Sequence, residues 1–403
     1  MAEVIINFLL YLFALFFHWK KFKVIDNGFI LLATYCLVAL ACVSQYMSAP
    51  LDWQGISLIP LLFLFGVNLL FFRPYLVNNN LITDKIQIKM SPVYFIFIYI
   101  YIILGGVVVF YGYDKMAETI LRNDWNAVRQ DVYSGDNVIY ENQLERFAKI
   151  FTGFLQPMAI LFFFYLLSEA FVKKHILTIV SLMLAVLIPS FLTIVSVASR
   201  GMIVLLIVQF LVSYFVFKKN ISKKTNRIIK FGSLFFLAIF VIYSMSVTQS
   251  RFGESEGGGI SGDAEDSLLF YFGHSMLTFA DGIADSIKSF LWGDYLFGKE
   301  EILKVGIDNL VGTHFDTKFF TYVGALYLDF GPFFTFIIAI IFPFLMALIF
   351  RYKKKLDMAD LMIYVYYLTF LINGVFVVGI GYYVGWMMIF SIYIIFKIVK
   401  LIA

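Results

Sequence analysis

The residue best placed to bind a charged ligand is Arg200, in the short segment Ala198-Ser199-Arg200-Gly201 between two long apolar runs. Ser199 is suited to cap the helix that begins there, and a helix amino terminus presents free N–H groups and the positive end of the helix dipole. An arginine gains nothing from that dipole, so an anion bound by both groups explains its position. A diphosphate or a carboxylate fits, because guanidinium binds either with two parallel hydrogen bonds. The alternative is an arginine that reaches toward lipid head groups.

Two further arginines stand in comparable surroundings. Arg251 follows an apolar run in the segment 248–253, where a cation is also favoured by the carboxyl end of a helix. Arg129 lies among aromatic and polar residues in the segment 125–135, WNAVRQDVYSG. That composition suits a sugar or head-group surface, and an aromatic belt at a membrane interface accounts for it equally well.

Histidines provide the candidate bases. Of the four histidines, His18 and His175 lie among lysines and are expected at an interface, which leaves His274 and His314. His314, in the segment 312–317, can orient a substrate hydroxyl or phosphate, or accept a proton. The sequence has no His-x-x-x-His pattern and no suitable cysteine pair, so we expect no metal and no other cofactor.

The elements that must position these residues are membrane helices. The chain has 403 residues, of which 61% are hydrophobic and 14% charged, against roughly 45–50% and about 25% in soluble domains. The apolar residues fall in blocks long enough to cross a bilayer. Since spanning segments must satisfy their own backbone hydrogen bonds, these blocks are predicted to be helices.

We predict a single all-α polytopic domain over residues 1–403 with about eleven spans. They are 3–18, 28–47, 55–72, 91–112, 148–170, 176–197, 201–217, 231–248, 332–350, 361–378 and 381–400. The apolar stretch from Phe319 is interrupted by Asp329, Gly331 and Pro332, and it is expected to be interfacial or partly inserted.

Lysine and arginine predict the orientation. One set of loops contains 20 of the 31 Lys and Arg residues, and the other set spreads 11 over much longer segments. The first set is expected in the cytoplasm, with the amino terminus outside and the carboxyl terminus inside. Two long outer loops then cover 113–147 and 249–331. The cytoplasmic loops are short and carry no Gly-rich phosphate loop, so chemistry is expected at the outer face.

Four short motifs, in this order and on this side of the membrane, resemble those of the O-antigen polymerases (Wzy), the oligosaccharide repeat unit polymerases. They are Ser199-Arg200-Gly201, Gln249-Ser250-Arg251, Thr313-His314 and Tyr327-Leu328-Asp329-Phe330-Gly331. The topology is similar over nearly the whole chain. Phe315 follows His314 where the related ligases carry asparagine, which argues against a ligase.

The resemblance implies a multi-span, GT-C-like glycosyltransferase of the bacterial inner membrane. Such enzymes move a glycan from undecaprenyl diphosphate onto the next lipid-linked repeat unit at the periplasmic face, without metal or nucleotide sugar. The implied partners are that donor and acceptor, membrane lipids, a chain-length regulator and a flippase, with no nucleic acid.

The resemblance also suggests roles for particular residues. Arg200 and Arg251 would bind the donor diphosphate, and Arg129 an anionic or sugar portion. His314 is the preferred base, with His274 or Asp281 in its place as alternatives, and Asp329 would cap or orient the loop within the substrate site.

Two other functions compete with polymerisation. An O-antigen ligase would transfer the glycan to a lipid A core. A flippase would carry cations through its span centres and usually an even number of spans, and the predicted spans show neither feature.

Overall fold

The computed structural model describes residues 1–48, 50–53, 55–77, 83–86, 91–122, 125, 127–128, 142–197, 201–252, 273–284, 290–299, 320–376 and 382–402. Over these residues the chain is helical and forms no β-strand beyond an isolated bridge between Ile86 and Leu356. It divides into two compact units. Unit 1 comprises 1–86, 265–356 and 367–391, and unit 2 comprises 87–264, 357–366 and 392–403.

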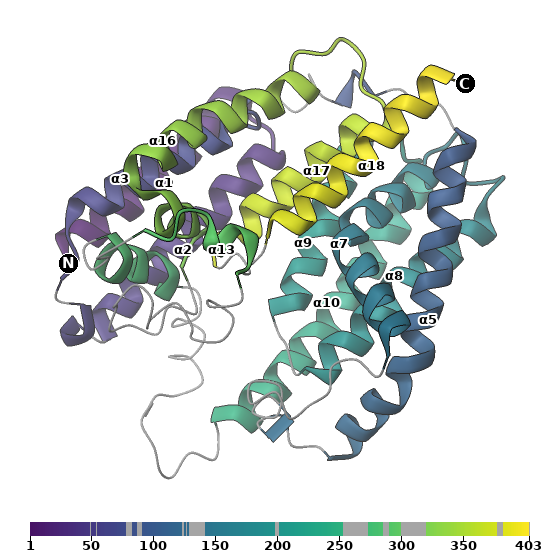
Figure 1. Ribbon diagram of the computed structural model, residues 1–403, viewed down its shortest axis with the longest axis horizontal. Coiled ribbons are helices and arrows are strands. Elements are labelled where there is room, and N and C mark those ends of the chain that lie inside the picture. Colours follow the sequence, from purple (N-terminus) through teal and green to yellow (C-terminus); the bar gives the residue numbers. More distant parts are fainter. Residues whose placement is uncertain are drawn as a thin grey trace. The chain divides into compact units, whose positions relative to one another are not determined.

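Unit 1 is built on three amino-terminal helices and one long later helix, α16 (Figure 1). Its elements are α1 (Ala2–Phe22), α2 (Asn27–Ser48), η1 (Pro50–Trp53), α3 (Leu58–Phe72), the π-helix η3 (Phe279–Ile283), α13 (Asp294–Phe297) and α16 (Tyr322–Phe350). Parts of α17 (Met358–Asn373) and α18 (Tyr383–Ile402) complete it. In Figure 1, α16 lies alongside α3.

The interior of unit 1 contains hydrogen-bonded polar groups. Asn68 donates its amide N–H to the hydroxyl oxygen of Tyr11 at 2.7 Å and accepts from the hydroxyl of Tyr322 at 2.7 Å. The hydroxyl of Tyr35 donates to the backbone oxygen of Leu371 at 2.8 Å. Because an unsatisfied polar group is costly in an apolar interior, these bonds tie α1, α2, α3, α16 and α17 together in one arrangement.

Unit 2 is a second helical bundle. It contains α5 (Pro92–Arg122), α7 (Gln143–Leu166), α8 (Ile176–Ser196), α9 (Gly201–Phe217), the 3-10 turn η2 (Lys218–Asn220) and α10 (Lys223–Phe252). Helices α5 and α8 lie side by side in Figure 1. A methyl group at Gly105 of α5 would come within 3.0 Å of the backbone oxygen of Ala185 in α8. Small residues at this contact let the two helices pack closely, as membrane helices commonly do.

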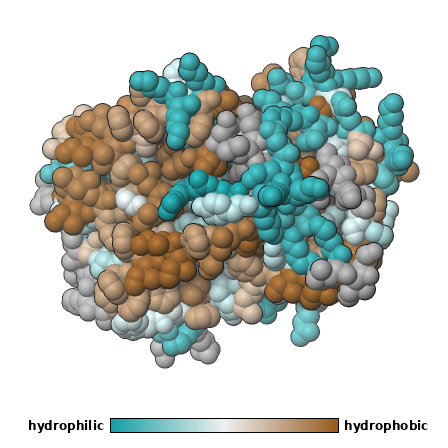
Figure 2. Space-filling model, turned by 90° about the horizontal axis from the view of Figure 1, so that it is seen from above, coloured by the Kyte–Doolittle hydropathy of each residue, from teal (hydrophilic) through white to brown (hydrophobic). Residues whose placement is uncertain are grey.

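The helices support the predicted class. Nine helices in the described part of the chain are long and apolar enough to cross a membrane, and α3 and α17 are shorter apolar helices of 15 and 16 residues. Large apolar side chains lie on the outside, among them Phe110 at 76% exposure and Leu177 at 80%, and Figure 2 shows broad apolar areas on the molecular surface. Such surface is typical of helices that face lipid. The chain is thus an all-α polytopic membrane protein.

Several helices extend beyond the predicted spans. Helix α5 continues to Arg122, into the segment expected as the first long outer loop, and α10 covers Lys223–Phe252 instead of 231–248. Helix α16 begins at Tyr322, ten residues before the predicted span, and the interruption expected near Gly331 is a kink within it, with φ 72° and ψ 177° at Gly331. Hydropathy marks only the part of a helix that lies in lipid, so helices that continue into water are predicted too short.

Candidate functional site

A row of buried polar side chains lies on the segment 273–284 of unit 1. His274, Thr278 and Asp281 follow one another at helical spacing, and their exposed fractions are 7%, 0% and 6%. Residues spaced in this way lie on one face of a helix. An imidazole, a hydroxyl and a carboxyl therefore line one buried face, and these groups can hold a sugar hydroxyl or exchange a proton with it.

Trp53 and Gly55 cover this face. The indole ring of Trp53 meets the imidazole of His274 edge to face, with 5.2 Å between ring centroids and 72° between ring planes. Two residues further on, Gly55 approaches Asp281 so closely that a methyl group at Gly55 would lie 2.2 Å from Oδ1. Glycine at position 55 is therefore what allows the cover to lie against the carboxyl group.

Asp281 stands in the middle of the π-helical turn η3. A π-helical turn holds one more residue than an α-helical turn, and such turns occur frequently at functional sites. Phe279 in the same turn packs against Phe63 of α3 and Tyr327 of α16, with ring centroids 6.5 Å and 5.7 Å away. These aromatic contacts fix the turn against two of the long helices of unit 1 and so fix the position of Asp281.

Asp329 has a different role from Asp281. Its two carboxylate oxygens accept hydrogen bonds from the backbone N–H groups of Tyr295 at 3.0 Å and Leu296 at 2.9 Å, at the start of α13. The carboxylate is buried, with an exposed fraction of 0%. Burial and the nearby Asp329 carboxylate also raise the pKa of the Tyr295 hydroxyl, which stays protonated at neutral pH. Asp329 thus holds the segment before and within α13 in place.

The backbone on either side of Asp329 adds to this attachment. Leu291 and Trp292 donate their backbone N–H groups to the carbonyl oxygens of Leu328 and Asp329 at 2.9 Å and 2.7 Å. At Gly331 the backbone adopts a positive φ, and a methyl group there would come within 3.0 Å of the ring of Phe290. The segment 290–297 therefore lies directly against the kink of α16.

Tyr327 connects the two parts of the site. Its hydroxyl donates to the backbone oxygen of Ala284 at 3.4 Å, and its ring contacts those of Phe279 and Phe290 at 5.7 Å and 6.1 Å. Three predicted site residues, His274, Asp281 and Asp329, are thereby brought into one neighbourhood of unit 1. The first two belong to the buried polar face, and the third anchors the adjoining segment.

The structure does not describe the side chains of the remaining predicted site residues. Arg129, Arg200 and His314 are outside the described residues. The backbone of Arg251 belongs to the last turn of α10, beyond the predicted end of that span, and its side chain is outside the described part. Among the residues that the structure describes, no three His, Cys, Asp or Glu side chains gather as metal ligands would.

Sequence reasoning missed Trp53, Gly55 and Thr278, and it named Tyr327 only as part of a motif and not as a site residue. The spacing of His274, Thr278 and Asp281 is a signal that was present in the sequence, since it is helical within a segment expected to be a loop. No comparable signal exists for Trp53 and Gly55, because they meet the site across more than two hundred residues of chain.

Comparisons with known proteins found no significant match. No protein-family model matches the sequence. No curated protein and no solved structure is significantly similar to it either.

Proposed function

We propose that this chain is a GT-C-like glycosyltransferase that joins undecaprenyl-diphosphate-linked oligosaccharide repeat units into O-antigen or a related surface polysaccharide. It would act at the periplasmic face of the bacterial inner membrane. The observation that carries the proposal is the buried polar face of His274, Thr278 and Asp281 beneath the cover at Trp53 and Gly55. A few polar groups gathered on one buried, mostly apolar face are typical of sites that bind a small polar ligand.

The reaction needs a leaving group and a base. The bond between the anomeric carbon of the donor glycan and its diphosphate breaks, and the acceptor hydroxyl oxygen forms the new glycosidic bond. Arg200 and Arg251 neutralise the charge that grows on the departing undecaprenyl diphosphate. The acceptor proton passes to His314, or to His274 or Asp281 if one of these residues is the base.

The other predicted residues hold the substrates. Arg129 binds a sugar or anionic portion of the glycan, while Thr278 and the imidazole of His274 suit sugar hydroxyls as hydrogen-bond partners. Asp329 acts through the segment that it anchors, since both of its oxygens accept backbone hydrogen bonds from α13. The lipid-linked donor carries its own diphosphate leaving group, so no nucleotide sugar takes part. The arginines supply the positive charge that a metal ion would otherwise bring to that group.

The experiment is a gel profile of surface glycan from a strain that lacks this chain. Loss of long chains with a single repeat unit still attached to the lipid core supports the proposal, because export and ligation then remain intact. Loss of the single unit as well would assign the chain to export or ligation instead. Restoration of long chains by the unmodified chain is the control.

A further inference from the structure

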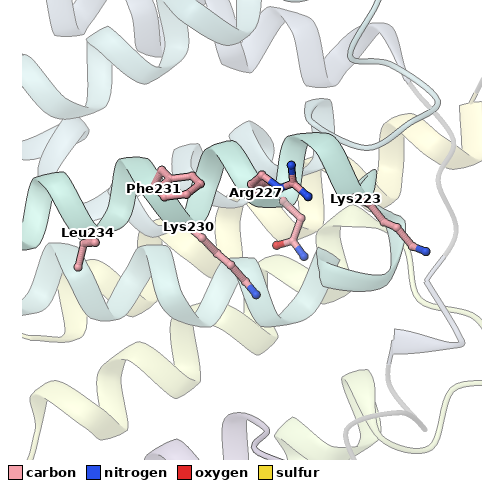
Figure 3. Close-up of a pocket in the computed structure, with 6 residues that line it drawn as sticks. Lys223, Arg227, Lys230, Phe231 and Leu234 are labelled. Atoms are coloured by element: carbon pink, nitrogen blue, oxygen red, sulfur yellow. The ribbon is translucent and has the colours of Figure 1, made fainter.

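The first turns of α10 carry a groove with an unusual lining. Its volume is about 620 Å³. The residues of the described part of the chain that line it are Lys223, Asn226, Arg227, Lys230, Phe231 and Leu234 of α10. Figure 3 shows the cationic side chains near the beginning of the helix and the two apolar ones further along it. Charge and apolar surface thus follow one another along a single groove.

The spacing of these residues explains the groove. They are three or four positions apart or adjacent, and at 100° per residue they occupy an arc of about 140° on the helix surface. Arg227 and Leu234 are about 10 Å apart along the axis, since each residue rises 1.5 Å. A molecule lying in the groove would meet three cations first and then an aromatic ring and a leucine.

The cations have no acidic partner in the described part of the chain. Ion pairs there involve other residues, and none includes Lys223, Arg227 or Lys230. All three side chains are exposed, and Lys223 stands in the first turn of α10, where the helix dipole disfavours positive charge. The preference for lysine and arginine on the cytoplasmic side accounts for cations in this part of the chain. It does not account for their position on one helix face beside exposed apolar side chains, which suits a bound anion with an apolar tail.

The apolar part of the groove is also open. Phe231 and Leu234 are 67% and 65% exposed. Asn226, between the cations, accepts a hydrogen bond from the hydroxyl of Tyr214 in α9 at 2.5 Å, which fixes this end of α10 against its neighbour. The groove thus lies at an end of α10 that is bonded to α9, and its apolar part is exposed.

We propose that this groove binds an anionic glycerophospholipid. The phosphate of the head group lies against Lys223, Arg227 and Lys230, and an acyl chain follows Phe231 and Leu234. The order of charge and apolar surface along the helix is that of the lipid itself, from head group to chain. The proposal stands apart from glycosyl transfer, because no residue of the groove belongs to the candidate functional site.

Native mass spectrometry of the full chain in detergent tests the binding, with phosphatidylglycerol and phosphatidylcholine added in equal amounts. We expect phosphatidylglycerol to bind at least about tenfold more tightly, since each lysine or arginine beside an anionic lipid contributes roughly fivefold. Equal binding of the two lipids would overturn the proposal. This measurement on the unmodified chain does not depend on whether any variant folds.

The double variant Arg227→Gln/Lys230→Gln locates the site. It should weaken phosphatidylglycerol binding at least about tenfold, and the matched pair Lys354→Gln/Lys355→Gln, two exposed lysines of unit 1, should change it less than about twofold. An equal loss in both variants would mean general attraction to charge and would overturn the site. Retention of binding in the first variant would overturn it as well.

The source of the phosphate is tested by competition. Glycerol 3-phosphate, which has the head-group phosphate but no acyl chain, should fail to displace phosphatidylglycerol. Displacement at comparable concentration would assign the groove to a free phosphate, and tighter binding of a polyprenyl diphosphate than of phosphatidylglycerol would assign it to a different lipid. Either result contradicts the proposal.

Discussion

The carboxylate of Asp281 lies against the backbone of Gly55, so that a methyl group on Gly55 would come within 2.2 Å of Oδ1. These two residues are far apart in the sequence and belong to the cover and to the buried polar face of the same unit. A methyl group at position 55 would therefore displace the carboxylate of Asp281. It also gives a way to move Asp281 without changing it.

Gly55→Ala should therefore push Asp281 aside and reduce glycan polymerisation. A shift of about 1 Å in a positioned group costs up to roughly 100-fold in rate, so we expect long surface glycan to fall roughly 10- to 100-fold while the protein reaches the membrane in normal amount. The measurement is the gel profile of surface glycan beside an immunoblot of the membrane fraction.

Gly66→Ala in α3 is the matched control, since a methyl group at Gly66 meets nothing within 4 Å. It should leave the glycan profile unchanged, because alanine is favoured over glycine inside a helix. Normal polymer length in Gly55→Ala would show that the position of Asp281 does not matter for the reaction.

We expect Asp329 to contribute mainly to the stability of the fold and not to the chemical step. Asp329→Ala removes both acceptors for the backbone N–H groups of Tyr295 and Leu296. Hydrogen bonds to a charged group contribute about 1.5–3 kcal/mol each, so the thermal unfolding midpoint in detergent should fall clearly. Asp329→Asn keeps one oxygen acceptor and should lie between Asp329→Ala and the unmodified protein.

Polymerising activity, measured per folded molecule, distinguishes an anchoring role of Asp329 from direct participation in the reaction. Per folded molecule, Asp329→Asn should retain much of the polymerising activity. An Asp329→Asn protein with an unchanged unfolding midpoint and no activity would instead identify Asp329 as a group that reacts with the substrate.

The ion pairs of Asp357 in unit 2 should make the stability of the protein depend on pH. Lys397 Nζ lies 2.8 Å from both of its carboxylate oxygens, and Lys400 Nζ lies 2.8 Å from one. Burial by itself would raise the pKa of Asp357, but the hydrogen bonds from the two lysines outweigh burial and hold that pKa well below its usual range. A carboxylate with a depressed pKa stabilises the folded state at neutral pH.

The stabilisation by Asp357 is fully present above the pKa of an unfolded aspartate, about 3.9, and is lost as the pH falls from there toward the folded pKa. Asp357→Asn should lower the unfolding midpoint at pH 7, and the gap to the unmodified protein should narrow below about pH 4. A gap that stays constant down to pH 2.5 would contradict a depressed pKa.

Arg200→Lys tests the proposed contact with the diphosphate. Lysine keeps the charge but loses the paired hydrogen bonds of guanidinium, so the variant should lose most polymerising activity, at least about tenfold, while it inserts normally. Arg351→Lys, at the end of α16, is the control and should leave the polymer unchanged. Full polymer length in Arg200→Lys would rule out the diphosphate role.

The sequence alone was sufficient to predict that the protein is an all-α membrane protein. Hydropathy is a local property, and a bilayer accepts only segments that satisfy their own backbone, so the apolar blocks predict helices wherever they occur. The kink at Gly331 could also be predicted, because glycine and proline disturb a helix regardless of its surroundings. The ends of α5 and α10 could not, since helices continue into water without a hydropathy signal.

Which polar residues come into contact could be learned only from the tertiary structure. The spacing of His274, Thr278 and Asp281 is visible in the sequence, but their burial beneath Trp53 and Gly55 depends on packing between distant segments. In the same way, the anchoring of α13 by Asp329 joins residues more than thirty positions apart. Such contacts follow from the free energy of the whole packed unit, and no short stretch of sequence contains that information.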